Sequence, residues 1–193
     1  MIVSNIANLP TEYGHFQIKA YQDGTQEHLA IFSTNLHKLT TPNVRIHSEC
    51  LTGDTLGSLK CDCHNQLHLA LEYISKNSGL VIYHRQEGRN IGLVNKVNAY
   101  HLQDQGYNTV EANEKLGFRA DERDYRAIKY ILDDLSIETI NIITNNPKKI
   151  EFLESNGITI AKRIEAITPV NDYNQNYLQT KEEELGHILS SRV

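Results

Sequence analysis

The three cysteines of this chain, Cys50, Cys61 and Cys63, lie close together in the pattern C-x10-C-x-C. Zinc prefers thiolate ligands, and a site with three protein ligands keeps a fourth coordination position for water. Zinc lowers the pKa of a water bound at that position, so that hydroxide forms near neutral pH. A structural zinc site would normally have a fourth protein ligand. The spacing therefore indicates a zinc site that takes part in catalysis.

Two other interpretations of the cysteines stay open. Free buried cysteines are ordinary in proteins of a reducing compartment. A disulfide fits less well, because the number of cysteines is odd and residues 1–5 lack the basic and apolar segments of a secretory signal. No apolar run approaches the roughly 18 residues that a membrane span needs. We therefore expect a cytoplasmic chain that does not interact with a membrane.

Length and composition predict an ordinary globular chain. With 193 residues, of which 39% are hydrophobic and 22% charged, a single domain over 1–193 is expected, with short mobile tails at its two ends. The net charge of −5 argues against nucleic acid as a partner, which would require an excess of basic residues. An anionic small molecule stays compatible with this charge, because a local basic cluster is enough to bind it.

The elements that must position the cysteines follow from hydrophobic periodicity. Alternating residues predict strands at 14–21 and 27–34, paired across a turn at Gly24. Further strands are expected at 44–47, 80–83, 139–143 and 158–164. Helical spacing predicts helices at 64–76, 92–105, 177–189 and after Asp121, and Asn146 with Pro147 marks another helix start. This alternation indicates an α/β fold with a mixed sheet flanked by helices.

Two segments of this arrangement could bind an anionic ligand. His84-Arg85-Gln86-Glu87-Gly88-Arg89 follows the strand at 80–83, and loops at that end of a strand often hold ligands in α/β sheets. Lys148 and Lys149 lie in the first turn of the helix that Asn146 begins, where backbone N–H groups and the helix dipole favour phosphate. Solvated surface charges are the simpler interpretation of each isolated residue, but not of their combination.

The chain resembles the GTP cyclohydrolase II family in order along almost its whole length, from Leu9 to His187. The segments that carry the resemblance are R-I-H-S-E-C-L-T-G-D, C-D-C, Y-H-R-Q-E-G-R-N-I-G-L, L-Q-D-Q-G-Y, T-V-E-A-N, L-G-F, A-D-E-R-D-Y and T-N-N-P-K-K. Segments of this length and order do not match by chance. The resemblance implies the α/β fold of that family.

The resemblance also implies an activity, the first committed step of riboflavin biosynthesis. GTP would be hydrolysed at two places, with loss of C8 as formate and release of pyrophosphate. The product would be 2,5-diamino-6-(5-phosphoribosylamino)pyrimidin-4(3H)-one. Cys50, Cys61 and Cys63 would hold one zinc ion per chain, whose hydroxide attacks C8. Magnesium would accompany the phosphates, and a homodimer is the expected assembly.

The family's functional residues match positions of this chain one by one. In the family, the residue that matches Asp121 is a proton acceptor, the one that matches Arg123 is a proposed nucleophile toward the α-phosphate, and the one that matches Tyr100 belongs to ring opening. Matching positions imply these GTP contacts: Arg45, Ile46, His47, Ser48, Glu49, Gln66, Glu87, Gly88, Arg89, Thr109, Thr144 and Lys149.

The chemistry of these residues adds two inferences of our own. Glu87 could accept the N1–H and amino donors of guanine, since a carboxylate is an acceptor. Arg123 is a difficult nucleophile, because a guanidinium stays protonated at neutral pH. It could instead stabilise phosphoryl charge without forming a covalent bond.

Two positions depart from the family pattern. His64 stands where glycine is usual, and Lys60 stands where arginine is usual. A histidine directly after Cys63 could close the zinc site as a fourth ligand, but adjacent ligands to one zinc are geometrically awkward, so we expect His64 to point elsewhere. Lys60 keeps the charge of arginine but loses its planar fork.

Two alternative functions follow from these uncertainties. One is an enzyme that opens the ring of another purine nucleotide or stops after one hydrolysis. The other is a non-catalytic nucleotide-binding or sensing protein with a closed structural zinc. The presence of Tyr100, Asp121 and Arg123 together argues against the second alternative, because binding alone would not need them.

Overall fold

The computed structural model describes residues 1–189, whose contacts divide the chain into two compact units. The last four residues of the predicted domain, 190–193, lie outside the described residues. Unit 1 comprises Met1–His47, Leu67–Arg85 and Tyr125–Ala166, and unit 2 comprises 48–66, 86–124 and, as far as it is described, 167–189. The prediction of a single domain is not tested by this division and stays a prediction.

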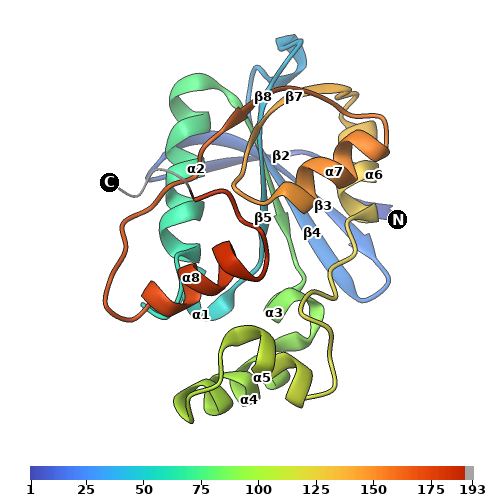
Figure 1. The fold of residues 1–193 in the computed structure, drawn as a ribbon. Helices are drawn as coiled ribbons and strands as arrows, with labels where there is room; N and C mark the ends of the chain where they lie inside the picture. The colour runs from blue at the N-terminus through green and yellow to red at the C-terminus, as the bar shows by residue number, and fades with distance from the viewer. Residues whose placement is uncertain (190–193) are drawn as a thin grey trace. The chain divides into compact units, whose positions relative to one another are not determined.

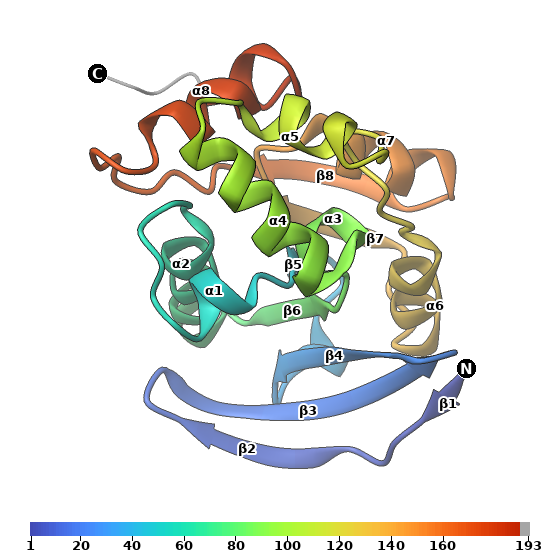
Figure 2. The same cartoon turned by 90° about the horizontal axis from the view of Figure 1, so that it is seen from below.

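Unit 1 contains the mixed sheet that the sequence predicts, with strand order β1-β3-β4-β6-β5-β7-β8 and β2 paired with β3 (Figures 1 and 2). Antiparallel pairs join β3 to β4 and β4 to β6, whereas β5, β7 and β8 are parallel. The bounds are β1 (Ile2–Val3), β2 (Ala7–Thr11), β3 (Gly14–Asp23), β4 (Gln26–Ser33), β5 (Asn43–Ser48), β6 (Gly79–His84), β7 (Thr139–Ile143) and β8 (Thr159–Ile164). The predicted mixed sheet is confirmed, while β1 and β2 were not predicted.

Helices cover both faces of this sheet, as Figure 2 shows. Alternate residues of a strand point to opposite faces. In β6, Leu80 and Ile82 belong to the larger apolar cluster with α6 (Arg126–Asp134), whereas Val81 packs in a second cluster with Ile74 of α2 (Cys63–Asn77). β6 is therefore buried on both sides, in agreement with the apolar run that predicted it.

Local signals set several boundaries in unit 1. Asn146 caps α7 (Pro147–Ser155) by accepting the Lys148 N–H at 3.0 Å, and Pro147 occupies the first helical position, as predicted. At the start of β6, Gly79 has φ +150°, and a Cβ there would lie 2.1 Å from the Asn43 carbonyl oxygen. Only glycine allows this close approach to β5. A short 3-10 helix, Leu36–Lys38, follows β4.

Unit 2 is made of helices and loops: α1 (Leu51–Asp54), the first residues of α2, α3 (Glu87–Asn90), α4 (Gly92–Asp104), α5 (Thr109–Lys115) and α8 (Gln175–Glu183). The helix predicted at 92–105 is confirmed as α4. The sequence analysis missed α5, although Asn108 and Glu111 form a capping box at its start.

The last predicted helix was wrong at its end. It was expected to run over 177–189, but α8 ends at Glu183. Gly186 then adopts a left-handed φ of 67°, and the His187 N–H donates to the Lys181 carbonyl oxygen at 2.9 Å. Glycine adopts a left-handed conformation without steric cost, so the chain turns away here instead of continuing the helix. In the described part of the chain, each helix is too short or too polar to cross a lipid bilayer.

Candidate metal centre and active site

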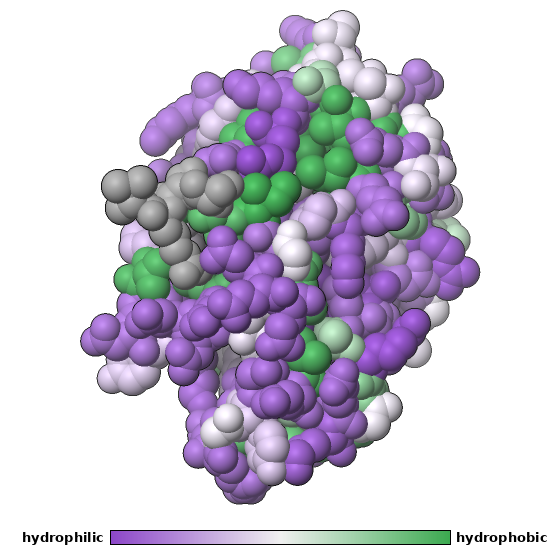
Figure 3. Space-filling view, in the orientation of Figure 1, coloured by the Kyte–Doolittle hydropathy of each residue, from purple (hydrophilic) through white to green (hydrophobic). Residues whose placement is uncertain are grey.

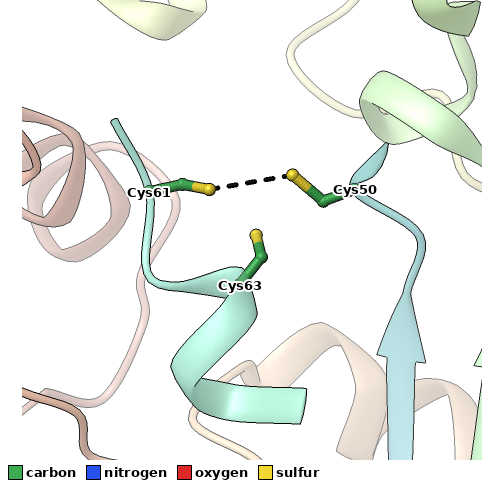
Figure 4. A group of neighbouring side chains, drawn as sticks. All are labelled: Cys50, Cys61 and Cys63. Atoms are coloured by element: carbon green, nitrogen blue, oxygen red, sulfur yellow. Dashed lines mark hydrogen bonds between the residues drawn. The ribbon is translucent and has the colours of Figure 1, made fainter. Parts of the chain in front are cut away.

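The three cysteines converge in unit 2, as the sequence predicts. Cys50 follows β5 and directly precedes α1, Cys61 lies in the turn before α2, and Cys63 is the first residue of α2. Their Sγ atoms all lie within 4.8 Å of one another, and the Cys50 and Cys61 sulfurs are 3.7 Å apart. Figure 4 shows the three side chains pointing toward one another. The turn at the start of α2 brings Cys61 and Cys63 to the same side.

The spacing of these sulfurs fits a zinc ion. Tetrahedral zinc with Zn–S bonds of about 2.3 Å places its sulfurs about 3.8 Å apart. The observed 3.7 Å matches this distance and is far too long for a disulfide. Among the described residues, the group of metal-ligating side chains comprises Cys50, Cys61 and Cys63 and leaves His64 out. Three protein ligands leave room for a fourth, non-protein ligand.

Gly53, in α1, makes space for the three thiols. A Cβ at this position would lie 2.9 Å from the Cys61 sulfur, 3.1 Å from the Cys50 sulfur and 3.0 Å from the Cys63 Cβ. The contact with the Cys61 sulfur is shorter than real Cβ atoms make and the other two are tight, so the cysteine side chains would have to shift by a few tenths of an ångström. The lack of a side chain at Gly53 therefore leaves the three thiols room to converge.

The thiols also polarise one another. Hydrogen bonds from Cys61 and Cys63 lower the pKa of Cys50, whereas the hydrogen bond with Cys50 raises the pKa of Cys61 to about 11. The pKa of Cys63 is raised for the same reason. The first thiolate thus forms readily at Cys50, and a metal would displace protons from the other two thiols.

Lys96 of α4 also contacts the three-cysteine group, through Cys50. Its Nζ lies 3.0 Å from the Cys50 sulfur and 2.7 Å from Glu87 Oε1. Glu87 also accepts the N–H groups of Leu51 at 2.6 Å and Gly88 at 2.9 Å. Sequence reasoning missed Lys96. Its position one helical turn before Tyr100 was the signal that could have found it.

Tyr100 is linked to the metal-ligating group through Thr52. The two hydroxyl groups share a hydrogen bond of 3.1 Å, and the Thr52 oxygen lies 3.7 Å from the Cys50 sulfur. Burial raises the pKa of Tyr100, so its hydroxyl stays protonated at neutral pH. Lys60 lies 5.1 Å from the centre of the Tyr100 ring and pairs with Asp104 at 2.6 Å. Tyr100 and the thiols, both predicted for ring opening, therefore lie in one place.

The segment between Cys61 and Cys63 is held by a buried ion pair. Asp62 is only 1% exposed, and it accepts hydrogen bonds from Lys181 Nζ at 2.7 Å and Gln66 Nε2 at 2.6 Å. Lys181 belongs to α8, so the C-terminal helix fastens the C-x-C turn. Gln66, predicted as a GTP contact, uses its amide nitrogen within this network. Asp62 and Lys181 were missed by sequence reasoning.

Asp121 and Arg123 form a second polar group in unit 2. The Arg123 guanidinium donates to both carboxylate oxygens of Asp121, at 2.8 and 2.5 Å, and to Ser48 Oγ at 3.0 Å. Burial by itself would raise the pKa of Asp121, but the hydrogen bonds and charge of Arg123 lower it to about 2. Asp121 is thus ionised at neutral pH and pairs with the positively charged Arg123.

The loop that includes Gly88 and Arg89 has an unusual backbone. Gly88, Arg89 and Asn90 have positive φ values of 62°, 59° and 74°. Such conformations are unfavourable for residues other than glycine and often occur at functional sites. Arg89 Nη1 donates to the Ala120 carbonyl oxygen and the Arg89 carbonyl accepts the Glu122 N–H, each at 3.2 Å. These bonds connect the loop to the segment that contains Asp121 and Arg123.

The remaining predicted GTP contacts form a group in unit 1, at the ends of the parallel strands β5 and β7. Arg45 donates to the Ile143 carbonyl oxygen at 3.0 Å, and Lys149 Nζ donates to the Ile46 carbonyl oxygen at 2.8 Å. Thr144 accepts the Asn146 N–H at 3.1 Å, and the His47 ring stacks on Tyr83. Carboxyl ends of parallel strands are common ligand positions. Of the other predicted contacts, Glu49 and Thr109 are half-buried in unit 2.

Comparisons with known proteins agree with this geometry. The family model described as GTP cyclohydrolase II matches residues 3–165. The GTP cyclohydrolase-2 of Campylobacter fetus subsp. fetus is 57% identical over 98% of this chain and 96% of its own length. That of Helicobacter pylori strain Shi470 is 52% identical over 97% of each chain.

Two further matches cover less of the related protein. The riboflavin biosynthesis protein RibBA of Staphylococcus saprophyticus is 49% identical over 94% of this chain but only 46% of its own length. A solved structure, the two-domain 3,4-dihydroxy-2-butanone 4-phosphate synthase RibBX of A. baumannii, is 18% identical with a TM-score of 0.42, over 86% of this chain and 40% of that one. This last likeness is too weak to support an inference. The full-length matches and the family model show that this chain belongs to the GTP cyclohydrolase II family.

Proposed function

We propose that this protein hydrolyses GTP to 2,5-diamino-6-(5-phosphoribosylamino)pyrimidin-4(3H)-one, formate and pyrophosphate, with one zinc ion per chain. The observation that carries the proposal is the group of three sulfurs with zinc spacing beside Tyr100. Family membership supports GTP as the substrate. Zinc held by Cys50, Cys61 and Cys63 would supply a Lewis acid and a bound water of lowered pKa for attack on C8.

Tyr100 is proposed to serve the ring-opening half of the reaction. Its hydroxyl is kept protonated by burial and is oriented by Thr52, so it can donate a proton or a hydrogen bond to a nitrogen of the opening ring. Thr52 also contacts Cys50, which fixes the distance between the hydroxyl and the thiols. This orientation beside the thiols supports the proposed role of the phenol as a proton donor in ring opening.

Asp121 and Arg123 are proposed to serve the release of pyrophosphate. Asp121 is ionised and could accept a proton once Arg123 turns toward a phosphate, because its pKa of about 2 reflects the present ion pair. Arg123 is proposed to stabilise phosphoryl charge rather than to act as the nucleophile, since a guanidinium paired with a carboxylate stays protonated. Magnesium is proposed to accompany the phosphates, as in the family.

The substrate contacts stay part of the proposal. Lys149 and Thr144, at the start of α7, and Arg45 with His47, at the end of β5, have the positive charge and N–H groups that suit an anion. Glu87 is proposed to face guanine with the acceptor capacity that its bonds to Lys96, Leu51 and Gly88 leave. The full proposed set is Arg45, Ile46, His47, Ser48, Glu49, Gln66, Glu87, Gly88, Arg89, Thr109, Thr144 and Lys149.

A homodimer and a cytoplasmic location complete the proposal. On α4, Leu93, Val94 and Val97 are 40%, 75% and 52% exposed and lie one helical turn or less apart. A second copy of the chain is proposed to cover this apolar stripe. Val94→Asp should then convert dimers into monomers in light scattering, whereas an unchanged dimer would show that the copies meet elsewhere. The free thiols of Cys50, Cys61 and Cys63 suit a reducing compartment.

The proposed activity is tested by incubating the zinc-loaded protein with GTP and measuring formate, pyrophosphate and the diaminopyrimidine. All three should appear in equal amounts. Formate from another purine nucleotide but not from GTP would support an enzyme with a different substrate. Binding of GTP with none of the three products would support a non-catalytic nucleotide-binding protein.

A further inference from the structure

Lys96 has two hydrogen-bond acceptors in the interior of unit 2, the Cys50 sulfur and the Glu87 carboxylate. It is only 8% exposed, and its Nζ lies 3.0 Å from the Cys50 sulfur and 2.7 Å from Glu87 Oε1. A buried ammonium group is costly unless anions pair with it. Glu87 provides this pairing and the Cys50 sulfur accepts a second N–H, so the ammonium group is held in place between them.

The charges around the thiols explain what this cation does. Three thiolates exceed the charge of one zinc ion by one negative charge, and Glu87 adds another. Lys96 contacts both Cys50 and Glu87 and balances one of these two negative charges. An N–H donated to a thiolate withdraws electron density from the sulfur, which leaves a bound metal more electron-poor.

The contacts of Glu87 add a constraint on geometry. Glu87 accepts the N–H of Leu51, the residue that follows Cys50, at 2.6 Å. Lys96 and Glu87 thus link the Cys50 sulfur to the backbone of the residue that follows it. Tyr100 lies one turn later on α4, with its ring 5.7 Å from Lys96 Nζ. One face of α4 thus carries both the cation beside Cys50 and the phenol bonded to Thr52.

We propose that Lys96 is a positioning residue for ring opening, which orients the Cys50 thiolate and increases the acidity of the metal that the three cysteines hold. The inference rests on the proposed zinc-dependent reaction. Its rival is a purely structural ion pair between Lys96 and Glu87 that fastens α4 to α3. The two interpretations differ in whether the electronic state of the Cys50 sulfur depends on Lys96.

Cobalt(II) in place of zinc reports on the sulfur directly, without GTP. In Lys96→Met the sulfur-to-cobalt charge-transfer band should move to longer wavelength, because the sulfur loses a hydrogen-bond donor. Lys96→Arg, which keeps charge and donors, should restore the band toward its original position. Lys76→Met is the matched control, since Lys76 pairs with Glu72 and is 74% exposed, and the band should not move.

Turnover of the zinc-loaded variants separates the two half-reactions. Lys96→Met should release formate about 10- to 100-fold more slowly, the usual effect of losing a partner of a metal ligand. Pyrophosphate release should stay close to that of the unsubstituted protein. If the unsubstituted protein releases no formate from GTP, the proposed function fails, while the cobalt band still decides the role of Lys96.

An unmoved charge-transfer band in a less stable Lys96→Met protein would overturn the proposal and leave a structural ion pair. If that variant does not fold, the unsubstituted protein provides the test. With cadmium-113 bound and lysines labelled with nitrogen-15, the protons of one ammonium group should show scalar coupling to the metal through the N–H···S bond. The absence of such a coupling would equally overturn the proposal.

Discussion

Units 1 and 2 are stabilised in different ways. In the described residues, both clusters of buried apolar side chains belong to unit 1, where Ile140, Ile142 and Ile128 are completely buried between the sheet and its helices. Unit 2 instead buries ion pairs, Lys96 with Glu87 and Lys181 with Asp62, close to the cysteines. On the face drawn in Figure 3, hydrophilic residues cover most of the surface and hydrophobic ones form small groups.

This difference suggests that unit 1 provides stability and unit 2 fixes the geometry of the cysteines. Apolar burial, at about 25 cal/mol per Å², stabilises a sheet without any ligand. Buried ion pairs contribute little net stability but fix geometry, because leaving either charge unpaired is costly. In unit 2 one lysine holds each ligand segment: Lys96 contacts Cys50, and Lys181 contacts Asp62 between Cys61 and Cys63. We infer that a metal bound by Cys50, Cys61 and Cys63 would stabilise unit 2 far more than unit 1.

Removal of a metal bound by the cysteines should have the largest effect. It should destabilise unit 2 far more than unit 1. Zinc bound by thiolates can contribute on the order of 10 kcal/mol to the folding of a small domain. After chelation, hydrogen exchange should accelerate strongly in α4 and the first turn of α2, while β4 and β6 stay protected. Equal loss of protection in both units would contradict the division.

Gly53→Ala should weaken metal binding without changing a ligand. The added Cβ would lie about 3 Å from atoms of all three cysteines, so zinc binding should weaken by at least about 10-fold in competition with a chelator. Gly57→Ala is the control: its φ of 66° makes alanine unfavourable, but a Cβ there meets no atom within 4 Å. Gly57→Ala should lower the stability of the fold without weakening zinc binding. Equal zinc affinity in both variants would show that the space at Gly53 does not matter for zinc binding.

Lys181→Met should destabilise unit 2 through Asp62. Breaking a buried ion pair costs about 3 to 5 kcal/mol, because Asp62 is left unpaired beside two ligands. The midpoint temperature of thermal unfolding and the zinc content should both fall. Adding Asp62→Asn should recover part of the stability, since no buried charge then stays unpaired. Independent, additive losses in a double-mutant cycle would show that the two residues do not interact.

Asp121→Asn should have a smaller, pH-dependent effect. The pKa of Asp121 is lowered from its ordinary value near 3.8 to about 2, so the ion pair stabilises the folded state above pH 4, and this stabilisation is lost as the pH falls through 2. The variant should lose at most about 2.5 kcal/mol between pH 5 and 8, since one pKa unit corresponds to about 1.4 kcal/mol. Below pH 4 the difference should shrink. A difference that grows in acid would contradict this.

Predictions from the sequence succeeded where signals were local. The β3–β4 hairpin, the Asn146 cap and the convergence of three cysteines needed only spacing and turn chemistry. The wrong end of α8 had a local signal too, because Gly186 stood within the predicted helix.

The contacts of Lys96 and Lys181 could not be predicted in the same way. Lys181 is 119 residues from Asp62, and Lys96 is 46 residues from Cys50. A lysine that pairs inside a protein has the same sequence appearance as one on its surface, and only tertiary folding distinguishes them. His64 illustrates the converse, since its residue type suits zinc but the described metal-ligating group leaves it out.

Tyr100→Phe tests most directly whether Tyr100 and the thiols serve ring opening, because it removes one hydroxyl and leaves the cysteines intact. With zinc bound and GTP supplied, formate and pyrophosphate are measured in the same sample. If the Tyr100 hydroxyl serves ring opening, formate release should fall by about 100-fold or more, the contribution of a positioned proton donor, while pyrophosphate release stays unchanged. Equal loss of both products in a folded, zinc-loaded variant, or no loss of either, would contradict the assignment of Tyr100 and the thiols to ring opening.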